Sequence, residues 1–467
     1  MAQIRVLEII FNFFRKLFPA TNTGPRTESD ESESVLQANK IVPPAVQADN
    51  SKASFSRNNQ TTQFRRPRII IALDFGTYST KVLIKRRGDK KASILMLDNH
   101  AEGYPEFTIP SLVRINRDRI YYGSRAIADN QGELYRWLKV KLLHADSYKT
   151  MGSSGRVDDQ LKHEALITAY IAWVLQQVKV RLDGQYGVGN YIPILNAAAP
   201  MNHIADEMRW AVYMGMFAIA HERIYGDPSK NYSELENIES IELFQEWLKN
   251  VVIPTQEERK CEIFPENLAP VISLAQRPQM RPGMYLIVDM GAGTTEISIN
   301  KVPSPHESFP VLCFCDRSVQ IGAKDLDGKN DPVLIEKLIR EACCTWGEGY
   351  QKVKGNMAET ESWQKLSILL AGGGTQNSAI QSAFKNAARK IFYPWAGQGA
   401  LSVQVYMPDG IEWNRQNANY SYLLSVAHGL TYERLEWPGF VKPFEISPAL
   451  PTREKKRPEY NWIYDPS

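Results

Sequence analysis

The sequence predicts an α/β protein built from two related lobes. Two segments share one construction, in which an apolar strand ends in an acid, a glycine-containing turn follows, and a second apolar strand returns. Their acids, Asp74 and Asp289, stand 215 residues apart. A third segment, at residues 366–378, is a buried-type strand that runs into three consecutive glycines. With 467 residues and 43% hydrophobic composition, the chain has enough apolar material for two cores.

The more informative of the two paired segments spans residues 285–300 and reads YLIVDMGAGTTEISIN. Alternating apolar residues on both sides of the glycines favour two short strands over a helix. Backbone N–H groups in such a turn can crowd an anion, and threonine hydroxyls add further donors. Asp289 ends the first strand, where it can order a magnesium ion or a water. The turn residues expected to bind phosphate are Gly291, Ala292, Gly293, Thr294 and Thr295.

The earlier segment spans residues 68–85 and reads RIIIALDFGTYSTKVLIK. Its apolar strand ends in Asp74, and its turn residues Gly76, Thr77 and Tyr78 are expected to hold phosphates. A single hairpin of this kind is weak evidence, because many ordinary hairpins resemble it. Two copies in one chain indicate two lobes that face one another across a nucleotide.

The third segment, residues 366–378, reads LSILLAGGGTQNS, and a helix-like stretch follows at residues 379–392. Three glycines between a strand and a helix allow a flat ring or a ribose to lie directly on the backbone, with the helix N-terminus directed at it. The residues expected to line this part of the site are Gly372, Gly373, Gly374 and Thr375.

In this order, the three segments resemble the phosphate 1, phosphate 2 and adenosine motifs of the actin, heat-shock-70 and sugar-kinase ATPase superfamily. The resemblance covers residues 66–440. It implies a two-lobed actin-like fold with duplicated ribonuclease-H-like mixed sheets, and ATP and Mg²⁺ in the cleft. The first lobe is expected at residues 65–280 and the second at 281–440, followed by an irregular tail at 441–467.

The resemblance also implies catalytic roles. Asp74 and Asp289 would order the water shell of the metal and the attacking water. In the heat-shock-70 family, a lysine beyond the first hairpin reaches the attacking water and the γ-phosphate, a role that suits a mobile point charge. Lys139 and Lys141 both stand in a similar place, and the sequence does not choose between them.

Two further segments match the family pattern with departures. Residues 320–327 read QIGAKDLD and resemble the chaperone turn Gly-Gly-x-Asp-Phe-Asp, which implies that backbone N–H groups near Gly322 reach a terminal phosphate. The glutamate that binds a magnesium water in the family falls on Glu266, although here proline precedes the glutamate instead of following it. Residues 422–432 resemble the helix that closes the second lobe, where His428 is expected to be packed rather than catalytic.

The chain begins with a segment unlike the rest. Residues 1–19 are expected to form an amphipathic helix, which is too short and too charged to span a bilayer. It could bind a membrane surface, dock into a groove of a protein partner, or fold back onto the body. Residues 20–64 are polar, with hardly an aromatic residue, and are expected to be a disordered linker.

Composition and net charge limit the classes of partner and the cellular location that we expect. A net charge of +3, with no basic stripe interleaved with aromatic residues, argues against nucleic acid. The cysteine count is odd, and the C-x-C and C-C spacings fit neither a disulfide framework nor a zinc site. Reduced thiols and a cytoplasmic location, with peripheral attachment to a membrane as an option, are therefore expected. The cysteines are Cys261, Cys313, Cys315, Cys343 and Cys344.

Several functions are compatible with these motifs. The leading interpretation is a slowly hydrolysing heat-shock-70-like ATPase that lacks a peptide-binding domain and acts as a nucleotide-dependent switch or chaperone-like component. The alternative is a membrane-associated actin-like filament protein, because Thr-Thr-Glu at residues 294–296 and Ala-Gly-Gly-Gly at 371–374 resemble bacterial cell-shape actins. A small-molecule kinase is disfavoured, since no candidate substrate-activating aspartate is recognisable. A nucleotide binder that does not hydrolyse ATP is a further alternative.

Overall fold

The chain divides into two units, Met1–Arg65 and Arg66–Ser467, and the fold below belongs to the second unit. The predicted helix at residues 1–19 and linker at 20–64 lie outside the residues that the computed structural model describes, as does most of the predicted tail. The described residues are 66–97, 101–143, 158–200, 207–227, 233–250, 260–276, 282–303, 310–326, 331–356, 366–388, 402–412, 418–433, 440–443 and 445–446.

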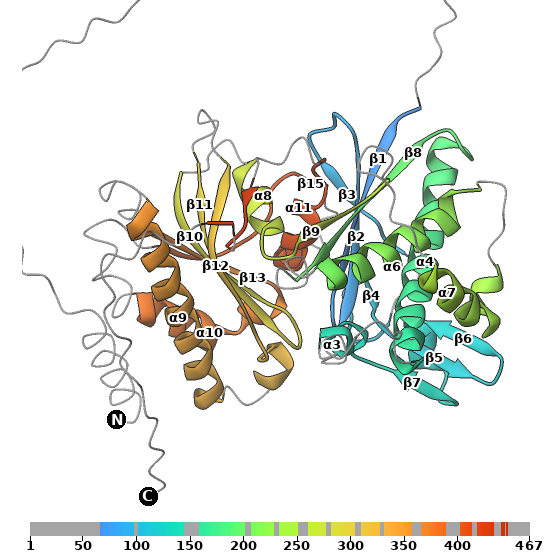
Figure 1. Cartoon of the computed structure of the whole chain (residues 1–467), viewed down its shortest axis with the longest axis horizontal. Coiled ribbons are helices and arrows are strands. Elements are labelled where there is room, and N and C mark those ends of the chain that lie inside the picture. The colour runs from blue at the N-terminus through green and yellow to red at the C-terminus, as the bar shows by residue number, and fades with distance from the viewer. Residues whose placement is uncertain are drawn as a thin grey trace, which may run out of the picture. The chain divides into compact units, whose positions relative to one another are not determined.

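The protein is an α/β structure with mixed sheets (Figure 1). The first sheet has the order β15-β3-β2-β1-β8-β9, with β4 paired to β2. Its strands are β1 (Arg68–Phe75), β2 (Ser79–Arg86), β3 (Ala92–Ile94), β4 (Thr108–Pro110), β8 (Ile192–Ala199), β9 (Cys261–Pro265) and β15 (Ile411–Glu412).

The second sheet has the order β14-β13-β10-β11-β12-β16. Its strands are β10 (Gly283–Met290), β11 (Thr295–Val302), β12 (Val311–Val319), β13 (Leu366–Ala371), β14 (Ser402–Val405) and β16 (Phe440–Val441). The tail predicted to be irregular from residue 441 therefore begins inside a strand, because β16 pairs in parallel with β12.

The two sheets repeat one arrangement of five strands. The order β3-β2-β1-β8-β9 in the first sheet corresponds to β12-β11-β10-β13-β14 in the second. In both, the central hairpin is antiparallel and its first strand pairs in parallel with the next strand along the sheet. The two predicted strand-turn-strand hairpins are confirmed, and they occupy the same place in their sheets.

Helices α4 and α6 lie beside the first sheet and α9 and α10 beside the second, while α7 packs on the outer side of α4 (Figure 1). The helices are α2 (Ser124–Ala128), α3 (Leu138–Leu143), α4 (Asp158–Tyr186), α6 (Glu207–Tyr225), α7 (Glu239–Lys249), α8 (Ala269–Ala275), α9 (Pro332–Asn356), α10 (Ser378–Ala387) and α11 (Ser425–Gly429). The 3₁₀ helices are η2 (Ser233–Glu236), η3 (Ala323–Leu326), η5 (Gly373–Gln376) and η7 (Ala418–Leu424).

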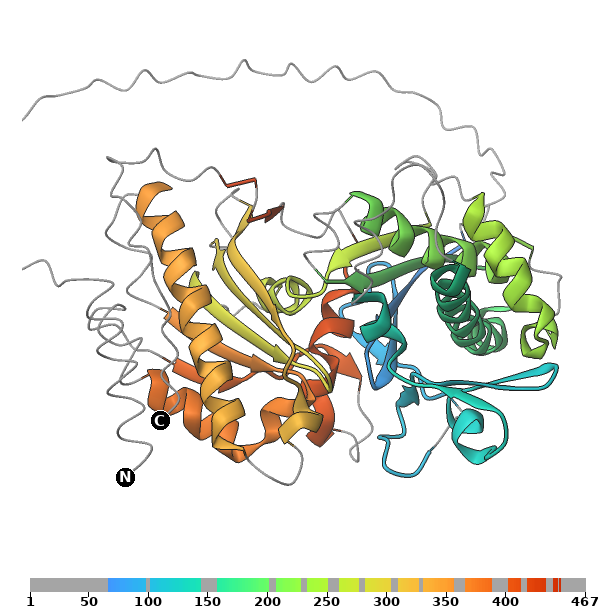
Figure 2. The ribbon, with the colours of Figure 1, turned by 60° about the horizontal axis from the view of Figure 1, so that its bottom comes forward.

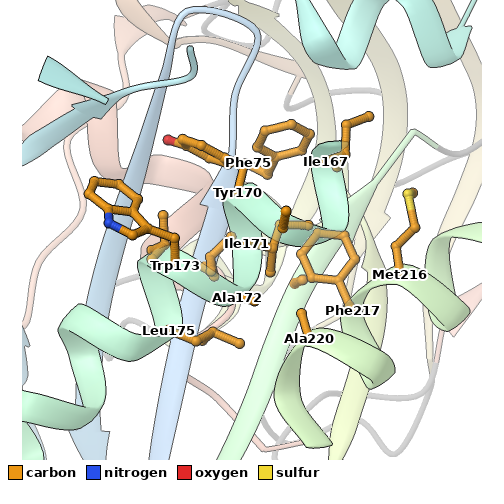
Figure 3. Packing of buried hydrophobic residues seen from close by; sticks show 14 of the residues in the cluster. Phe75, Ile167, Tyr170, Ile171, Ala172, Trp173, Leu175, Met216, Phe217 and Ala220 are labelled. Atoms are coloured by element: carbon orange, nitrogen blue, oxygen red, sulfur yellow. The ribbon is translucent and has the colours of Figure 1, made fainter. Parts of the chain in front are cut away.

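The core of the first sheet forms between β1 and the long helix α4 (Figure 3). Tyr170 and Trp173 of α4 are both buried, and the Tyr170 ring lies 5.8 Å from the ring of Phe75 on β1. The facing helix α6 adds Phe217, which is fully buried. This packing fixes the end of β1, from which the first glycine turn begins.

A small sheet extends from this region. It has the order β6-β5-β7 and consists of β5 (Val113–Asn116), β6 (Arg119–Tyr122) and β7 (Glu133–Tyr135). A bridge between Arg119 and Asn237 attaches it to the segment that leads into α7. Figure 2 shows it standing apart from the strands of the first sheet.

Helices α8 and α11 lie between the two large sheets (Figure 1). One buried cluster joins Ala72 of β1, Ile287 of β10, Val271 of α8 and Ala427 of α11. Residues 422–432 were expected to close the second lobe. The structure differs, because α11 packs on α8 and on β1 and β2 of the first sheet.

A buried polar network ties these helices to the connection between the sheets. Ser273 of α8 lies with its Oγ 2.6 Å from Nδ1 of His428 on α11, and the same Oγ contacts the hydroxyl of Tyr406. Tyr406 stands on the chain that runs from β14 of the second sheet to β15 of the first. All three side chains are buried, so His428 is a packed residue in this structure.

Replacing Ser273 by alanine is expected to lower the free energy of unfolding by about 1–3 kcal/mol, because the buried partners lose a hydrogen bond. Urea denaturation measures the change. Ser402→Ala is the matched control: this half-buried serine bonds Ser367 at a sheet edge, and its loss should cost less than about 0.5 kcal/mol. Equal effects at both serines would contradict the structural role of the network.

Candidate functional site

A cavity of 360 Å³ lies where the turns of the two hairpins meet. It brings together most of the site residues that the sequence predicted. Those that line it are Asp74, Gly76, Thr77, Tyr78, Lys139, Glu266, Asp289, Gly291, Ala292, Thr294, Gly372 and Gly373. Segments from three distant parts of the chain therefore share one cavity, as the motif order predicted.

Five predicted residues are described by the structure but do not line this cavity, namely Gly293, Thr295, Gly322, Gly374 and Thr375. The two threonine hydroxyls donate within the protein instead, at 2.6 Å to the carbonyl of Ile321 from Thr295 and at 2.7 Å to the carbonyl of Gly372 from Thr375. They hold the backbone around the cavity. The side chain of Lys141 lies outside the described part of the chain.

The prediction for Gly322 also differs from its observed contacts. Its N–H donates to the Asp325 carboxylate at 2.7 Å, and the next N–H, of Ala323, donates to the carbonyl of Gly291 at 2.9 Å. A Cβ at Gly322 would stand 2.2 Å from the carbonyl oxygen of Ala292. Gly322 therefore allows η3 to pack closely on the second turn, and its N–H is bonded to Asp325.

A series of buried hydrogen bonds supports the first turn. Ser111 Oγ donates to the carbonyl of Gly76 at 2.8 Å and lies 3.1 Å from Thr80 Oγ1. The hydroxyl of Tyr170, from α4, donates to Thr80 Oγ1 at 2.9 Å. These bonds fix the conformation of the turn at the cavity wall.

Paired charges cross each hairpin at the same position. Asp74 of β1 faces Lys81 of β2, and their Oδ2 and Nζ atoms lie 3.1 Å apart. In the second hairpin, Asp289 faces Glu296. Both partners stand seven residues after their acid and line the cavity. The repeated register thus places an ion pair on one side of the cavity and two carboxylates on the other.

Lys139 and Glu266 form a second ion pair in the cavity. The Nζ of Lys139 donates to Oε2 of Glu266 at 2.6 Å, and the lysine is 4% exposed. Burial lowers the pKa of Lys139, but the charges of Glu266 and Asp74 outweigh it and leave the pKa raised. Lys139 is therefore a fixed cation inside the site.

Replacing Lys139 and Lys141 separately by alanine distinguishes the two candidates. We expect Lys139→Ala to slow ATP turnover by about 100-fold, because the cavity loses a cation that can neutralise phosphate. Lys141→Ala should leave turnover within about twofold of wild type. Steady-state phosphate release measures both, and equal indifference at the two positions would refute a catalytic lysine on α3.

The carboxylates of the second hairpin have raised pKa values. Burial raises the pKa of Asp289 to about 7, and the charges of Glu266 and Asp74 add to the effect. Burial and Glu266 raise the pKa of Glu296 to about 8, although Ser318 donates to its Oε1 at 2.7 Å. Both groups can therefore exchange a proton near neutral pH, as a general base or acid requires.

These shifts predict a pH dependence of stability. A carboxyl group whose pKa is higher in the folded than in the unfolded state contributes to the free energy of unfolding. This contribution is fully present below the pKa of the unfolded state and is lost as pH rises through the pKa of the folded state. For Glu296, that window runs from pH 4.5 to about 8. The free energy of unfolding of Glu296→Gln should therefore fall less across this window than that of the wild type, by about 4 kcal/mol. Urea denaturation at pH 5 and pH 8.5 measures the difference, and parallel pH profiles would contradict burial of an ionisable Glu296.

The glycine segment at residues 372–374 forms another part of the cavity wall. Gly372 has a φ of +80°, and a Cβ there would stand 2.3 Å from Oδ1 of Asp289. Gly373 faces Leu423, and Val426 also lines the cavity. The strand-glycine segment therefore meets an apolar surface from η7 and α11 as well as the acid of the second hairpin.

Several cavity residues were not predicted. The main ones are Ser79, Lys81, Glu296, Lys324, Leu423 and Ser425. Lys81 and Glu296 carried a usable signal, since each is a charged residue that stands seven positions after the acid of its hairpin. The others come from segments whose approach to the cavity no local pattern indicates.

Four acidic side chains, of the type that bind divalent cations in proteins, line the cavity. Asp74, Glu266, Asp289 and Glu296 all line it, and carboxylates are the ligands that Mg²⁺ prefers. Among the described residues, no three His, Cys, Asp or Glu side chains are placed to hold a metal ion together.

No protein-family model matches the chain, and no curated protein matches its sequence. Within the described stretches, no helix is both long enough and apolar enough to cross a membrane.

Proposed function

We propose that the protein binds ATP with Mg²⁺ in the cavity between the two hairpin turns and hydrolyses it slowly. One observation carries the proposal: both glycine turns and the strand-glycine segment line the same cavity. Ordinary hairpins 215 residues apart have no reason to converge in this way. Glycine turns with inward N–H groups suit phosphates, and a glycine segment suits a ribose or a ring.

The architecture supports the same proposal. Two mixed sheets that repeat one order of five strands, with α8 and α11 between them, fit the two-lobed actin-like fold with duplicated ribonuclease-H-like cores. In such a fold, the nucleotide lies between the lobes. Opening and closing about the connecting helices would then limit turnover.

The residues that line the cavity would have different roles in hydrolysis. The first turn, with Thr77, and the second turn, with Thr294, would hold the β- and γ-phosphates from opposite sides. Lys81 and Lys139 would neutralise charge on the phosphates. Asp289, with its pKa near 7, would orient the attacking water and take its proton. Mg²⁺, when bound, would neutralise phosphate charge through waters held by Asp74 and the other carboxylates.

The biological role that we favour is a heat-shock-70-like nucleotide switch or chaperone-like component. Lys139 and Glu266 both line the cavity and support this interpretation, because the resemblance placed a catalytic lysine at Lys139 or Lys141 and a glutamate near Glu266. We further propose a cytoplasmic protein that residues 1–19 recruit to a protein partner or a membrane surface, with no nucleic-acid partner.

One observation favours a second candidate, an actin-like filament protein attached to a membrane. Glu296 lines the cavity opposite Asp289, and it belongs to the Thr-Thr-Glu segment that resembles bacterial cell-shape actins. A filament protein would use ATP to control polymerisation and would need the same catalytic residues.

ATP turnover by the full chain, with light scattering recorded in the same cuvette, tests and separates these roles. Slow phosphate release without a rise in scattering would support the switch. An ATP-dependent rise that fades as ATP is consumed would favour the filament. Faster phosphate transfer on addition of sugars would favour a small-molecule kinase, and an absence of turnover and binding would refute the ATPase.

A further inference from the structure

Lys324 spans the cavity from the second hairpin to the first. Its backbone belongs to η3, which is fixed to the second turn because the N–H of Lys324 donates to the carbonyl of Ala292 at 3.1 Å. Its Nζ lies 4.1 Å from the ring centroid of Tyr78 and 4.3 Å from that of Trp137. An ammonium at this distance is attracted by the face of each ring.

Tyr78 lines the cavity on the side of the first hairpin, and Trp137 stands two residues before Lys139, which also lines it. Tyr78 is part of the first turn, and its ring stacks on Tyr104 with centroids 4.4 Å apart. Trp137 directly precedes α3, the helix that carries Lys139. Lys324 therefore connects the second turn to the first turn and to the segment that positions Lys139.

The backbone at Trp137 is a second, independent observation. Its φ is +60°, in the left-handed region that bulky residues rarely adopt. Conformational strain of this kind persists only where surrounding structure enforces it, and it concentrates at ligand clamps and switch regions. Here the strained residue presents its ring to Lys324, which lines the cavity.

We propose that Lys324, held by Tyr78 and Trp137, is a clasp that keeps the two glycine turns together and slows the release of a bound nucleotide. This inference rests on the proposed function, since it concerns ATP in the same cavity. A nucleotide leaves when the turns separate, and their separation breaks both ring contacts. Two cation–π contacts at a partly exposed site are expected to slow release about tenfold.

The test is a displacement experiment on the full chain. A fluorescent N-methylanthraniloyl derivative of ATP is bound, excess unlabelled ATP is added, and the dissociation rate is followed by stopped flow. Lys324→Met removes both ring contacts and should speed dissociation about tenfold, whereas Trp137→Leu removes one of them and should speed it about threefold. Lys324→Arg should keep the wild-type rate, because a guanidinium also stacks on aromatic faces. Lys337→Met, at an exposed lysine on α9, is the matched control and should leave the rate unchanged.

The double variant Lys324→Met/Trp137→Leu should release nucleotide only slightly faster than the faster single variant. The two effects should not multiply, because both substitutions break the same clasp. A dissociation rate within twofold of wild type in Lys324→Met would overturn the clasp and leave the ATPase standing. Complete loss of binding in Lys324→Met would also overturn it, because the lysine would then hold the nucleotide itself. If the wild-type chain bound neither ATP nor its derivative, the proposed function would fail and the clasp with it.

Discussion

Replacing Asp289 by asparagine is expected to lower ATP turnover by at least about 100-fold while the fold is retained. Asp289 is the last residue but one of β10, is 9% exposed and has a pKa raised to about 7 by burial and by neighbouring acids. An amide of the same size keeps the packing but cannot accept the proton of an attacking water. Steady-state phosphate release measures the loss, and far-UV circular dichroism checks the fold.

Asp316→Asn is the matched control for this experiment. Asp316 lies on β12 of the same sheet, and burial raises the pKa of its carboxyl to about 6, but it does not line the cavity. The control variant should keep turnover within about twofold of wild type. Unchanged turnover in Asp289→Asn would remove Asp289 from the catalytic site, and an equal loss in both variants would point to a general structural effect.

Replacing Gly372 by alanine is expected to reduce ATP affinity by about 100-fold and to lower the free energy of unfolding by about 1–3 kcal/mol. Two effects combine at this position. The φ of +80° is strained for a residue with a side chain, and the new Cβ would stand 2.3 Å from Oδ1 of Asp289 and 2.5 Å from the carbonyl oxygen of Met290. Relief of either contact moves the glycine segment or the acid. Equilibrium titration with Mg·ATP and urea denaturation measure the two changes.

The neighbouring glycine provides the control. A Cβ at Gly373 would meet only the end of the Leu423 side chain within van der Waals range, at 3.0 Å, and this side chain can rotate away. Gly373→Ala should therefore be several-fold milder than Gly372→Ala in both measurements. Wild-type affinity in Gly372→Ala would show that the glycine segment does not contact the nucleotide.

Much of this fold could be predicted because the signals are local. Alternating apolar residues around Gly76 and Gly291 predict hairpins, and the structure confirms both. The repetition of one construction predicted two related halves, and the strand order repeats accordingly. The glycines predicted part of the cavity lining: Gly76, Gly291, Gly372 and Gly373 line it, whereas Gly293, Gly322 and Gly374 do not.

The remaining features depend on contacts between distant segments. Lys324 reaches Trp137 only because η3 packs on the second turn and α3 lies near the first. The sequence of neither segment indicates this contact. The position of α11 between the sheets likewise follows from its close packing on α8, where a Cβ at Gly429 would stand 1.9 Å from the carbonyl oxygen of Ala269. Glu296 is the case that spacing could have identified.

Amide hydrogen exchange of the full chain with and without Mg·ATP tests the central claim most directly. It reports on three separate segments at once, the turn at residues 75–79, the turn at 290–294 and the glycines at 372–374. If ATP lies in the cavity that these segments share, all three should gain protection together, and a Gly372→Ala chain should show little gain at the same ATP concentration. Protection confined to other segments, or no protection at saturating ATP, would contradict nucleotide binding at this site.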